Sequence, residues 1–352
     1  MRAVIMAGPR EVVVEHVEDP SLPGGDGAII RVEATSICGS DLHPYIGEMD
    51  GWMQRGWFRR PGHEFVGTVV EAGPDVRTVG VADRVFVLPE VACGRCARCR
   101  AGEVLACSVE PGFILGVHPA WPGGQAEYAA VPRADLTLRP IPAGVSDETA
   151  VLLTDALPTG YYGAVCAEIG PGSSAVVFGL GPVGLFAVQS ALLRGASRVF
   201  AVDLLADRRA RAEAVGAIPI DATQGDVVAT IRDLNDGQLV DGTVEAAGVD
   251  ETLVQALAVT REYGAIGVIA AHADPKHGVL LGKGFTRSQT VRTHVTPLQR
   301  VVDEIQPLVA AGRFVTDGIF THVHPLSEAS KAYELFADRR DGCLKVLLDP
   351  TT

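Results

Sequence analysis

The sequence predicts an α/β protein with two domains, one rich in β-strands and one built on a doubly wound parallel sheet. The chain has 352 residues, more than one hydrophobic core usually supports. Short β-type runs separated by glycine, proline and aspartate fill its first part, up to about residue 150. Strands and helices then alternate, which is typical of a parallel sheet covered by helices on both faces.

Composition and charge exclude several classes of protein. Apolar residues make up 47% of the chain and charged residues 21%, which predicts a folded globular protein. The net charge of −13 argues against nucleic acid or an anionic membrane as a partner. No apolar run approaches the roughly 20 residues of a membrane helix, and the N-terminal segment alternates like a strand without the apolar core of a signal peptide. We therefore expect a cytoplasmic location, where clustered cysteines bind metals more often than they form disulfides.

The elements of the β-rich part follow from its short apolar runs. Strands are expected within residues 27–38, 65–73, 83–91 and 126–141. A helix is expected after Ser146, which can cap it, because Asp147 and Glu148 then occupy its first turn and complement the helix dipole.

The second part predicts a repeating strand–helix order. Its strands are expected at residues 173–179, 197–203, 218–222, 239–248 and 264–271. Helices are expected between them, at residues 181–196, 205–216, 225–237 and 250–262. This unit should end near residue 294, and the remaining tail predicts two helices and a closing strand.

The stretch "VVFGLGPVGL" predicts a dinucleotide site, because G-x-G-x-x-G follows a strand here and opens a helix. The first glycine permits a tight turn, the second lets the backbone approach a diphosphate, and the third lets the helix pack on the strand. The diphosphate would then lie at the positive end of the helix dipole. The residues expected at this turn are Gly179, Gly181, Pro182, Val183 and Gly184.

The acid at the end of the second strand favours NAD. Asp203 can accept hydrogen bonds from the hydroxyls of the adenosine ribose and would repel the 2′-phosphate of NADP. Arg208 and Arg209 follow closely and could hold that phosphate. The preference therefore stays open at this point.

Two groups of residues have the spacing of metal ligands. Cys93, Cys96, Cys99 and Cys107 form C-x2-C-x2-C-x7-C, a density of thiols that predicts a metal. A second group gathers in "TSICGSDLH" and "RRPGHEFVG", which contain Cys38, Ser40, Asp41, His43, His63 and Glu64.

With these motifs the chain resembles the zinc-dependent medium-chain dehydrogenases/reductases, the alcohol dehydrogenase family, over essentially its whole length. The resemblance implies a GroES-like β-rich catalytic domain of residues 1–156 and 295–352, interrupted by a Rossmann NAD-binding domain of residues 157–294. It implies a structural zinc on the four-cysteine lobe, where no position stays open for substrate. It also implies a catalytic zinc on Cys38, His63 and Asp155, because "TDALPTG" is similar to the D-x-x-P-T-G of formaldehyde dehydrogenase-like members. Two zinc ions per subunit are thus expected.

The resemblance also implies the activity, which is transfer of a hydride between a primary or secondary alcohol and NAD. Ser40 and His43 would form a proton relay, and Asp41 would orient His63. Glu64 would either approach the metal from behind or replace a ligand. Among cofactor contacts, the resemblance puts Thr159 beside the nicotinamide and Lys345 near the diphosphate. Members of the family form homodimers or homotetramers, and residues 264–271 could supply an edge strand for such an assembly.

Three other functions compete with this interpretation. A polyol or sugar dehydrogenase of the same family shares every motif. A zinc-free NADPH quinone reductase on the same fold would not need Cys38, His63 and Asp155. A non-catalytic NAD-binding protein would not need Ser40 and His43 beside a metal. The loop of residues 44–62, with Trp52, Trp57 and Phe58, either lines an apolar substrate pocket or packs on the domain.

Overall fold

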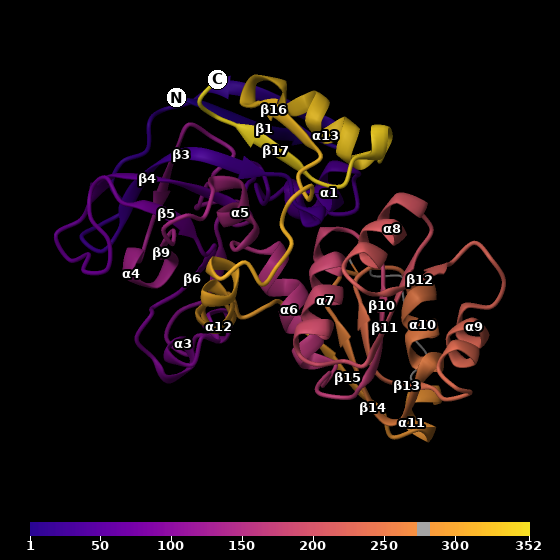
Figure 1. The fold of residues 1–352 in the computed structure, drawn as a ribbon. Helices are drawn as coiled ribbons and strands as arrows, with labels where there is room; N and C mark the ends of the chain where they lie inside the picture. The colour runs from indigo at the N-terminus through magenta and orange to yellow at the C-terminus, as the bar shows by residue number, and fades with distance from the viewer. Residues whose placement is uncertain (273–281) are drawn as a thin grey trace. The chain divides into compact units, whose positions relative to one another are not determined.

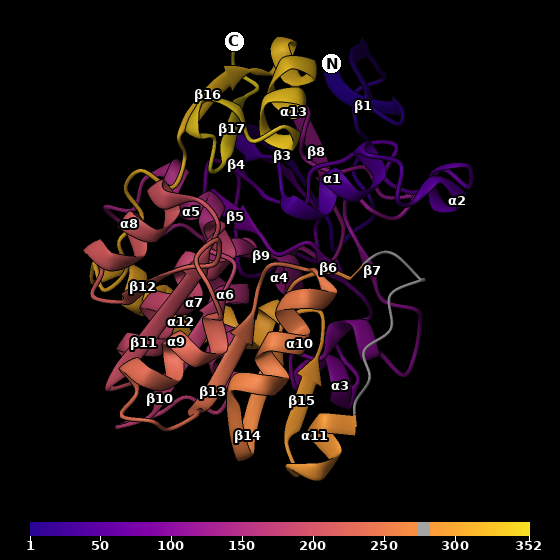
Figure 2. The same ribbon diagram turned by 90° about the vertical axis from the view of Figure 1, so that its right-hand side faces the viewer.

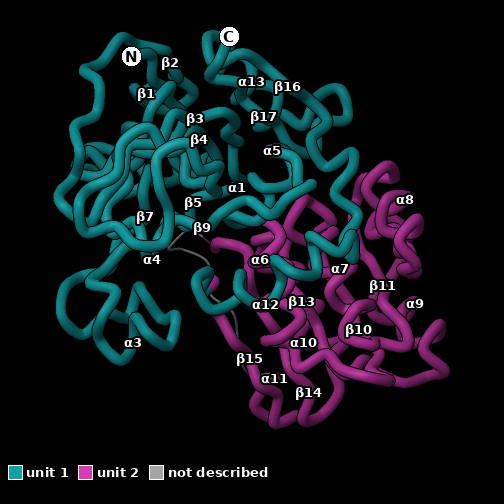
Figure 3. Tube along the Cα trace, turned by 60° about the vertical axis from the view of Figure 1, so that its left-hand side comes forward, with its two compact units in different colours: residues 1–155, 297–352 teal, residues 156–296 magenta. Residues whose placement is uncertain are grey.

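The computed structural model describes residues 1–272 and 282–352, which form two compact units (Figure 3). Unit 1 combines residues 1–155 with residues 297–352, and unit 2 consists of residues 156–296. These boundaries lie beside the expected ones at 156 and 295. Among the described residues, no helix is long and apolar enough to cross a membrane.

Unit 1 is built on a seven-stranded sheet in the order β16-β17-β3-β4-β5-β9, with β8 also paired to β3 (Figure 1). Its strands are β3 (Ala28–Ser36), β4 (Phe65–Ala72), β5 (Arg84–Val87), β8 (Tyr128–Val131), β9 (Leu138–Pro140), β16 (His322–Pro325) and β17 (Val346–Asp349). Two small antiparallel pairs accompany it, β1 (Arg2–Gly8) with β2 (Glu11–His16) and β6 (Glu90–Val91) with β7 (Phe113–Ile114). The sheet joins the two segments of unit 1, because β17 pairs with β3.

The helices of unit 1 are short except near the C-terminus. They are α1 (Gly39–Tyr45), α2 (Asp50–Met53), α3 (Ala97–Arg100), α4 (Ala134–Thr137), α5 (Asp147–Leu152), α12 (Leu298–Ala310) and α13 (Ala329–Ala337), with 3-10 turns at Val104–Ala106, Leu326–Glu328 and Arg340–Gly342. Ser146 caps α5 as expected, since its Oγ accepts the N–H of Thr149 at 3.2 Å. Such a cap stabilises a helix by about 1 kcal/mol.

Two apolar clusters hold unit 1 together. The inner faces of β3, β4 and β5 pack around Phe65 and Leu115, which are fully buried. The second cluster centres on Tyr333 and Phe336 of α13, which cover Ile37 at the end of β3. The second cluster therefore supports the turn that carries Cys38 and α1.

Unit 2 is a six-stranded parallel sheet in the order β12-β11-β10-β13-β14-β15. Its strands are β10 (Ser174–Phe178), β11 (Arg198–Asp203), β12 (Ile218–Asp221), β13 (Val240–Glu245), β14 (Thr260–Val268) and β15 (Thr290–Thr293). The helices are α6 (Ala156–Cys166), α7 (Pro182–Leu193), α8 (Ala206–Ala214), α9 (Val227–Leu234), α10 (Asp250–Val259) and α11 (Gly282–Thr286). Figure 2 shows α9 and α10 in front of this sheet, where their apolar sides meet buried Phe178 and Phe200.

One expectation about this sheet is wrong. Residues 264–271 were expected to offer an edge strand, but β14 lies between β13 and β15. β15 was not predicted because only four polar or β-branched residues, "TVRT", form it, and all four are partly or fully exposed. Among the described strands, β15 and β12 are the edges of the sheet.

Candidate active site

Four side chains of unit 1 converge in the arrangement of a metal site. The potential ligand atoms of Cys38, His63, Glu64 and Asp155 all lie within 4.8 Å of one another. Cys38 caps α1 just after β3, and His63 and Glu64 directly precede β4. Asp155 Oδ2 lies 3.3 Å from Cys38 Sγ and 3.5 Å from His63 Nε2. Because β3 and β4 are paired, the end of β3 and the start of β4 bring Cys38, His63 and Glu64 together.

Asp41 lies behind the ring of His63. Its Oδ1 is 3.5 Å from His63 Nδ1, on the side of the ring opposite to Asp155. Its Oδ2 accepts the N–H of Cys38 at 3.0 Å and faces the amide of Gln125 at 3.4 Å. This position suits the orienting role expected of Asp41. Gln125, which belongs to no motif in the sequence, is held in turn by the hydroxyl of Tyr333.

Helix α1 carries the two residues of the expected proton relay. Ser40 Oγ lies 3.2 Å from His63 Nε2, and so on the same side of the ring as Asp155. His43 Nδ1 lies 2.5 Å from Glu48 Oε2. Glu48 was not among the predicted site residues. Its signal in the sequence is a carboxylate five residues after His43.

Glu64 and Lys345 form a buried ion pair. Lys345 Nζ donates to Glu64 Oε2 at 2.6 Å, and the two side chains are only 2% and 1% exposed. Burial lowers the pKa of Lys345. The charge and hydrogen bond of Glu64, together with Cys38 and Asp155, outweigh burial in sum, so the pKa of Lys345 is raised. The hydroxyl of Ser36 donates to the same Glu64 oxygen. Lys345 was expected near the cofactor's diphosphate; in the structure its ammonium group contacts Glu64 and the carbonyl of Ile37.

The four cysteines of the lobe also converge. The sulfur–sulfur distances are 3.5 Å for Cys93–Cys107 and Cys96–Cys99, and 3.8 Å for Cys93–Cys99 and Cys96–Cys107. None is in a disulfide. A tetrahedral zinc with Zn–S bonds of about 2.3 Å needs sulfurs about 3.8 Å apart. Backbone N–H groups of Cys99 and Ser108 lower the pKa of Cys96 to about 5, so a thiolate is already favoured there.

The glycine turn between β10 and α7 has the shape expected of a dinucleotide site. Gly179 has φ +84°, and a Cβ on Gly184 would lie 1.8 Å from the Gly179 carbonyl oxygen. A Cβ on Gly181 would meet only Arg208, at 4.0 Å, so the backbone there is open to a ligand. Pro182 is the first residue of α7, where its missing N–H costs nothing.

Asp203 closes this turn from the neighbouring strand. Its Oδ2 accepts the N–H of Leu180 at 2.7 Å, and its Oδ1 accepts that of Leu205 at 2.9 Å. Arg208 Nη1 lies 3.9 Å from Asp203 Oδ2.

Two other predicted residues have different settings. Thr159 lies in α6, which packs so closely on α7 that a Cβ on Gly160 would be 2.5 Å from the Val183 carbonyl oxygen. Arg209 was expected to be available to a 2′-phosphate, but it is bound to Asp221.

Comparisons with known proteins agree with this geometry. Residues 24–143 match the family model of the alcohol dehydrogenase GroES-like domain, and residues 182–310 match that of the zinc-binding dehydrogenases. A probable zinc-binding alcohol dehydrogenase of Mycobacterium tuberculosis is 41% identical over 99% of this chain and 89% of its own. The chain belongs to the zinc-dependent medium-chain alcohol dehydrogenase family.

Two further members of this alcohol dehydrogenase family bear on the site. A glutathione-independent formaldehyde dehydrogenase of Pseudomonas aeruginosa is 33% identical over 95% of this chain and 94% of its own. The alcohol dehydrogenase of Thermus sp. ATN1 has a solved structure that matches with a TM-score of 0.90 and 35% identity, over 99% of both chains. The expected GroES-like and Rossmann architecture is confirmed.

The residues of the first site fit a zinc ion. Thiol sulfur, imidazole nitrogen and carboxylate oxygen are the ligand atoms that zinc uses in proteins. Burial raises the pKa of Cys38 to about 11, with Glu64 and Asp155 acting in the same direction. Among the described residues, Glu64 Oε1 is buried with no hydrogen-bond partner. A divalent cation would offset both the crowded negative charge and this unpaired oxygen.

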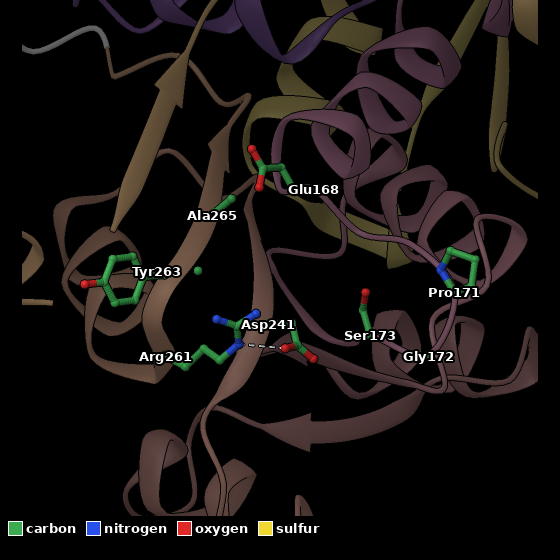
Figure 4. Close-up of a pocket in the computed structure, with 9 residues that line it drawn as sticks. Glu168, Pro171, Gly172, Ser173, Asp241, Arg261, Tyr263 and Ala265 are labelled. Carbon is green, nitrogen blue, oxygen red and sulfur yellow. Dashed lines mark hydrogen bonds and ion pairs between the residues drawn. The ribbon is translucent and has the colours of Figure 1, made fainter. Parts of the chain in front are cut away.

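A cavity of about 330 Å³ in unit 2 is not part of either predicted site (Figure 4). Arg261 and Asp241 line it and form an ion pair at 2.7 Å. Its lining includes Ser173, just before β10, and Asp241 and Arg261, the second residues of β13 and β14. In open parallel sheets ligands bind at the opposite, carboxyl ends of the strands.

Glu90 predicts a pH dependence of stability in this dehydrogenase. Burial raises its pKa to about 8, although the N–H of Leu298 acts in the opposite direction. Above its usual pKa of 4.5 the unfolded chain loses a proton that the folded chain keeps. The free energy of unfolding therefore falls as pH rises from 4.5 to about 8. Glu90→Gln removes this loss of unfolding free energy at higher pH, which is on the order of a few kcal/mol at most.

Thermal melting of wild type and Glu90→Gln at mildly acidic and mildly alkaline pH tests this. The variant should gain in melting temperature relative to wild type as pH rises. Glu71→Gln, at an exposed position, is the control and should show no such trend. A constant difference between wild type and Glu90→Gln across this range would contradict the expectation.

Proposed function

We propose that the protein oxidises primary or secondary alcohols to aldehydes or ketones with NAD, or catalyses the reverse reaction, and holds two zinc ions per chain. The observation that carries the proposal is the convergence of Cys38, His63 and Asp155 beside Ser40. A structural or NAD-binding protein has no need of a hydroxyl at such a site. The glycine turn with Asp203 supports NAD as the acceptor.

A zinc ion held by Cys38, His63 and Asp155 would supply Lewis acidity that lowers the pKa of an alcohol hydroxyl. Ser40 and His43 lie on one short helix and are the groups that can hold and move the proton released. Glu48 would fix the ring of His43 through a hydrogen bond to Nδ1 of that ring. Asp41 would fix that of His63, so that Nε2 faces the metal ligands.

The partner of Glu64 indicates what that residue does. Its Oε2 is bound to Lys345 and Ser36, while its Oε1 remains without a hydrogen bond. Breaking such a buried pair by removing one partner costs about 3–5 kcal/mol. Lys345 would therefore hold Glu64 behind the ligand set. Glu64 Oε1 could then either approach the metal from behind or replace one of its ligands.

A substrate panel with zinc-loaded protein tests the proposed reaction. Formation of NADH is measured with aliphatic, aromatic and polyol alcohols and with formaldehyde, each with NAD and with NADP. Turnover of simple alcohols with NAD supports the proposal. Turnover restricted to polyols would favour a polyol dehydrogenase, and no turnover with any alcohol would favour a non-catalytic NAD-binding protein. A homodimer or homotetramer in the cytoplasm is part of the proposal and is tested by light scattering and by cell fractionation.

The loop of residues 44–62 would set the size of the substrate. Trp57 contacts both Trp52 and His118, with ring centroids 4.9 Å apart in each pair. Phe58 is buried, and its N–H bonds to the Val117 carbonyl at 2.9 Å. The loop thus packs on the segment around His118, while Trp52 remains 47% exposed.

We expect Trp52→Ala and Trp57→Ala to lower kcat/KM for medium-sized apolar or aromatic alcohols more than for ethanol, by roughly fivefold, because aromatic contacts of this kind contribute about 1 kcal/mol. Kinetics over an alcohol chain-length series measure this. Trp121→Ala, which removes a ring stacked on Phe113, is the control for packing alone. An unchanged ranking of substrates with lower melting temperatures in both loop variants would show that the loop only packs.

A further inference from the structure

Two aspartates stand side by side at the predicted adenosine end of the dinucleotide site. Asp203 ends β11 and Asp221 ends β12, and the two residues are paired in the register of these parallel strands. The carboxyl ends of the strands are where the ligand of such a sheet binds. Of these two aspartates, only Asp203 was predicted from the sequence to contact the cofactor.

Asp221 holds the guanidinium group of Arg209. The distance from Arg209 Nη2 to Asp221 Oδ2 is 2.7 Å. Arg209 Nη1 donates to the carbonyl oxygens of Asp203 at 3.0 Å and Leu204 at 2.8 Å. The Arg209 side chain is only 15% exposed. Arg209 therefore ties the carboxyl ends of β11 and β12 together.

The two carboxylate oxygens of Asp221 bind different partners. Oδ1 accepts the N–H of Thr223 at 2.9 Å and its hydroxyl at 2.7 Å, which shapes the turn after β12. Oδ2 faces Arg209. These bonds from Thr223, together with the charge of Arg209, lower the pKa of Asp221, so the carboxylate stays ionised.

We infer that Asp221 is a positioning residue for cofactor selection, which keeps Arg209 away from a 2′-phosphate and adds a second negative charge where that phosphate would lie. Guanidinium groups bind phosphate in a bidentate manner when they are available. A change at Asp203 alone would therefore admit NADP poorly, because Arg209 would still be bound to Asp221. This inference rests on the proposed preference for NAD and names the residues that complete it.

The test compares Asp203→Gly with Asp203→Gly/Asp221→Asn in the full-length, zinc-loaded protein. The asparagine oxygen can keep both bonds from Thr223, while its NH2 group would face Arg209 Nη2 as donor against donor. Calorimetry gives the dissociation constants of adenosine 2′,5′-bisphosphate and of 5′-AMP. We expect Asp221→Asn to shift the ratio of the two constants toward the bisphosphate by about tenfold, since the released guanidinium group can form a charge-assisted hydrogen bond to the 2′-phosphate. Adding Arg209→Gln should abolish this gain.

The matched control is Asp203→Gly/Asp207→Asn. Asp207→Asn removes one charge from an exposed position of α8, the helix that carries Arg209. Its ratio should change by no more than about twofold, because exposed charges are screened. Retained binding of 5′-AMP shows in every variant that the site is folded. An equal gain from Asp207→Asn, or a gain that survives Arg209→Gln, would overturn the inference. Tighter binding of the bisphosphate by the wild type would refute the NAD preference itself, whereas a wild type that prefers 5′-AMP and no gain from Asp221→Asn would refute only the role of Asp221.

Discussion

Asp155→Ala is expected to abolish turnover and to reduce the zinc content from two ions per chain to one. Of the three proposed ligands only Cys38 and His63 would remain, where catalytic zinc sites have three protein ligands. The Lewis acidity lost with the ion is worth several kcal/mol of transition-state stabilisation, which corresponds to about a thousandfold or more in kcat/KM. Asp155 lies at the boundary of unit 1, so the fold should remain largely intact.

Elemental analysis, alcohol kinetics and thermal melting of the same sample check this expectation. Asp155→Cys is the informative control, since cysteine is also a zinc ligand and should keep the second ion and part of the activity. Asp147→Ala controls for loss of an aspartate from α5, because its partner is the exposed Arg84. An Asp155→Ala protein with two zinc ions, or a wild type with one, would contradict the assignment.

Cys96→Ser is expected to have the largest effect on stability. The four sulfurs of the lobe are already at the separations that a tetrahedral zinc requires, and structural zinc contributes folding free energy directly. Loss of one thiolate opens the site, so we expect one zinc per chain and a fall in melting temperature of more than about 5 °C, with lower solubility.

Cys343→Ser is the matched control, because Cys343 is buried in the core of unit 1 and belongs to neither group of ligands. It should lose stability without loss of zinc. Metal analysis with melting curves separates the two effects. Full zinc content in Cys96→Ser would show that the lobe does not bind the ion through all four cysteines.

Local patterns were sufficient to predict most of the fold, and the family resemblance carried by short motifs selected the ligand residues that the structure brings together. The buried strands β10 and β11 contain continuous apolar runs, and the glycine turn has fixed spacing, so both are visible along the chain. Cys38 and His63 lie in short motifs at the ends of paired strands. The sequence also placed the helix cap at Ser146 correctly.

Contacts made only by the tertiary structure could not be read in this way. The ion pair of Lys345 with Glu64 joins positions 281 residues apart. Arg209 meets Asp221 because two parallel strands end at the same level. β15 was missed because a four-residue, partly exposed strand has no apolar periodicity. In each case the information lies in strand pairing, which no local window contains.

The pairing of β17 with β3 has a consequence for the order of folding. Residues 156–296 are contiguous and can fold as soon as they leave the ribosome, since domains generally fold as units during synthesis. Unit 1 must wait, because β17 and Lys345 are translated long after β3 and Glu64. Until Lys345 has been translated, Glu64 lacks its ion-pair partner, and burying the charged carboxylate would be unfavourable. Unit 1, which carries the candidate metal site, is therefore the last to mature, and a ribosome that stops before residue 345 would release a folded unit 2 attached to an unfinished metal site.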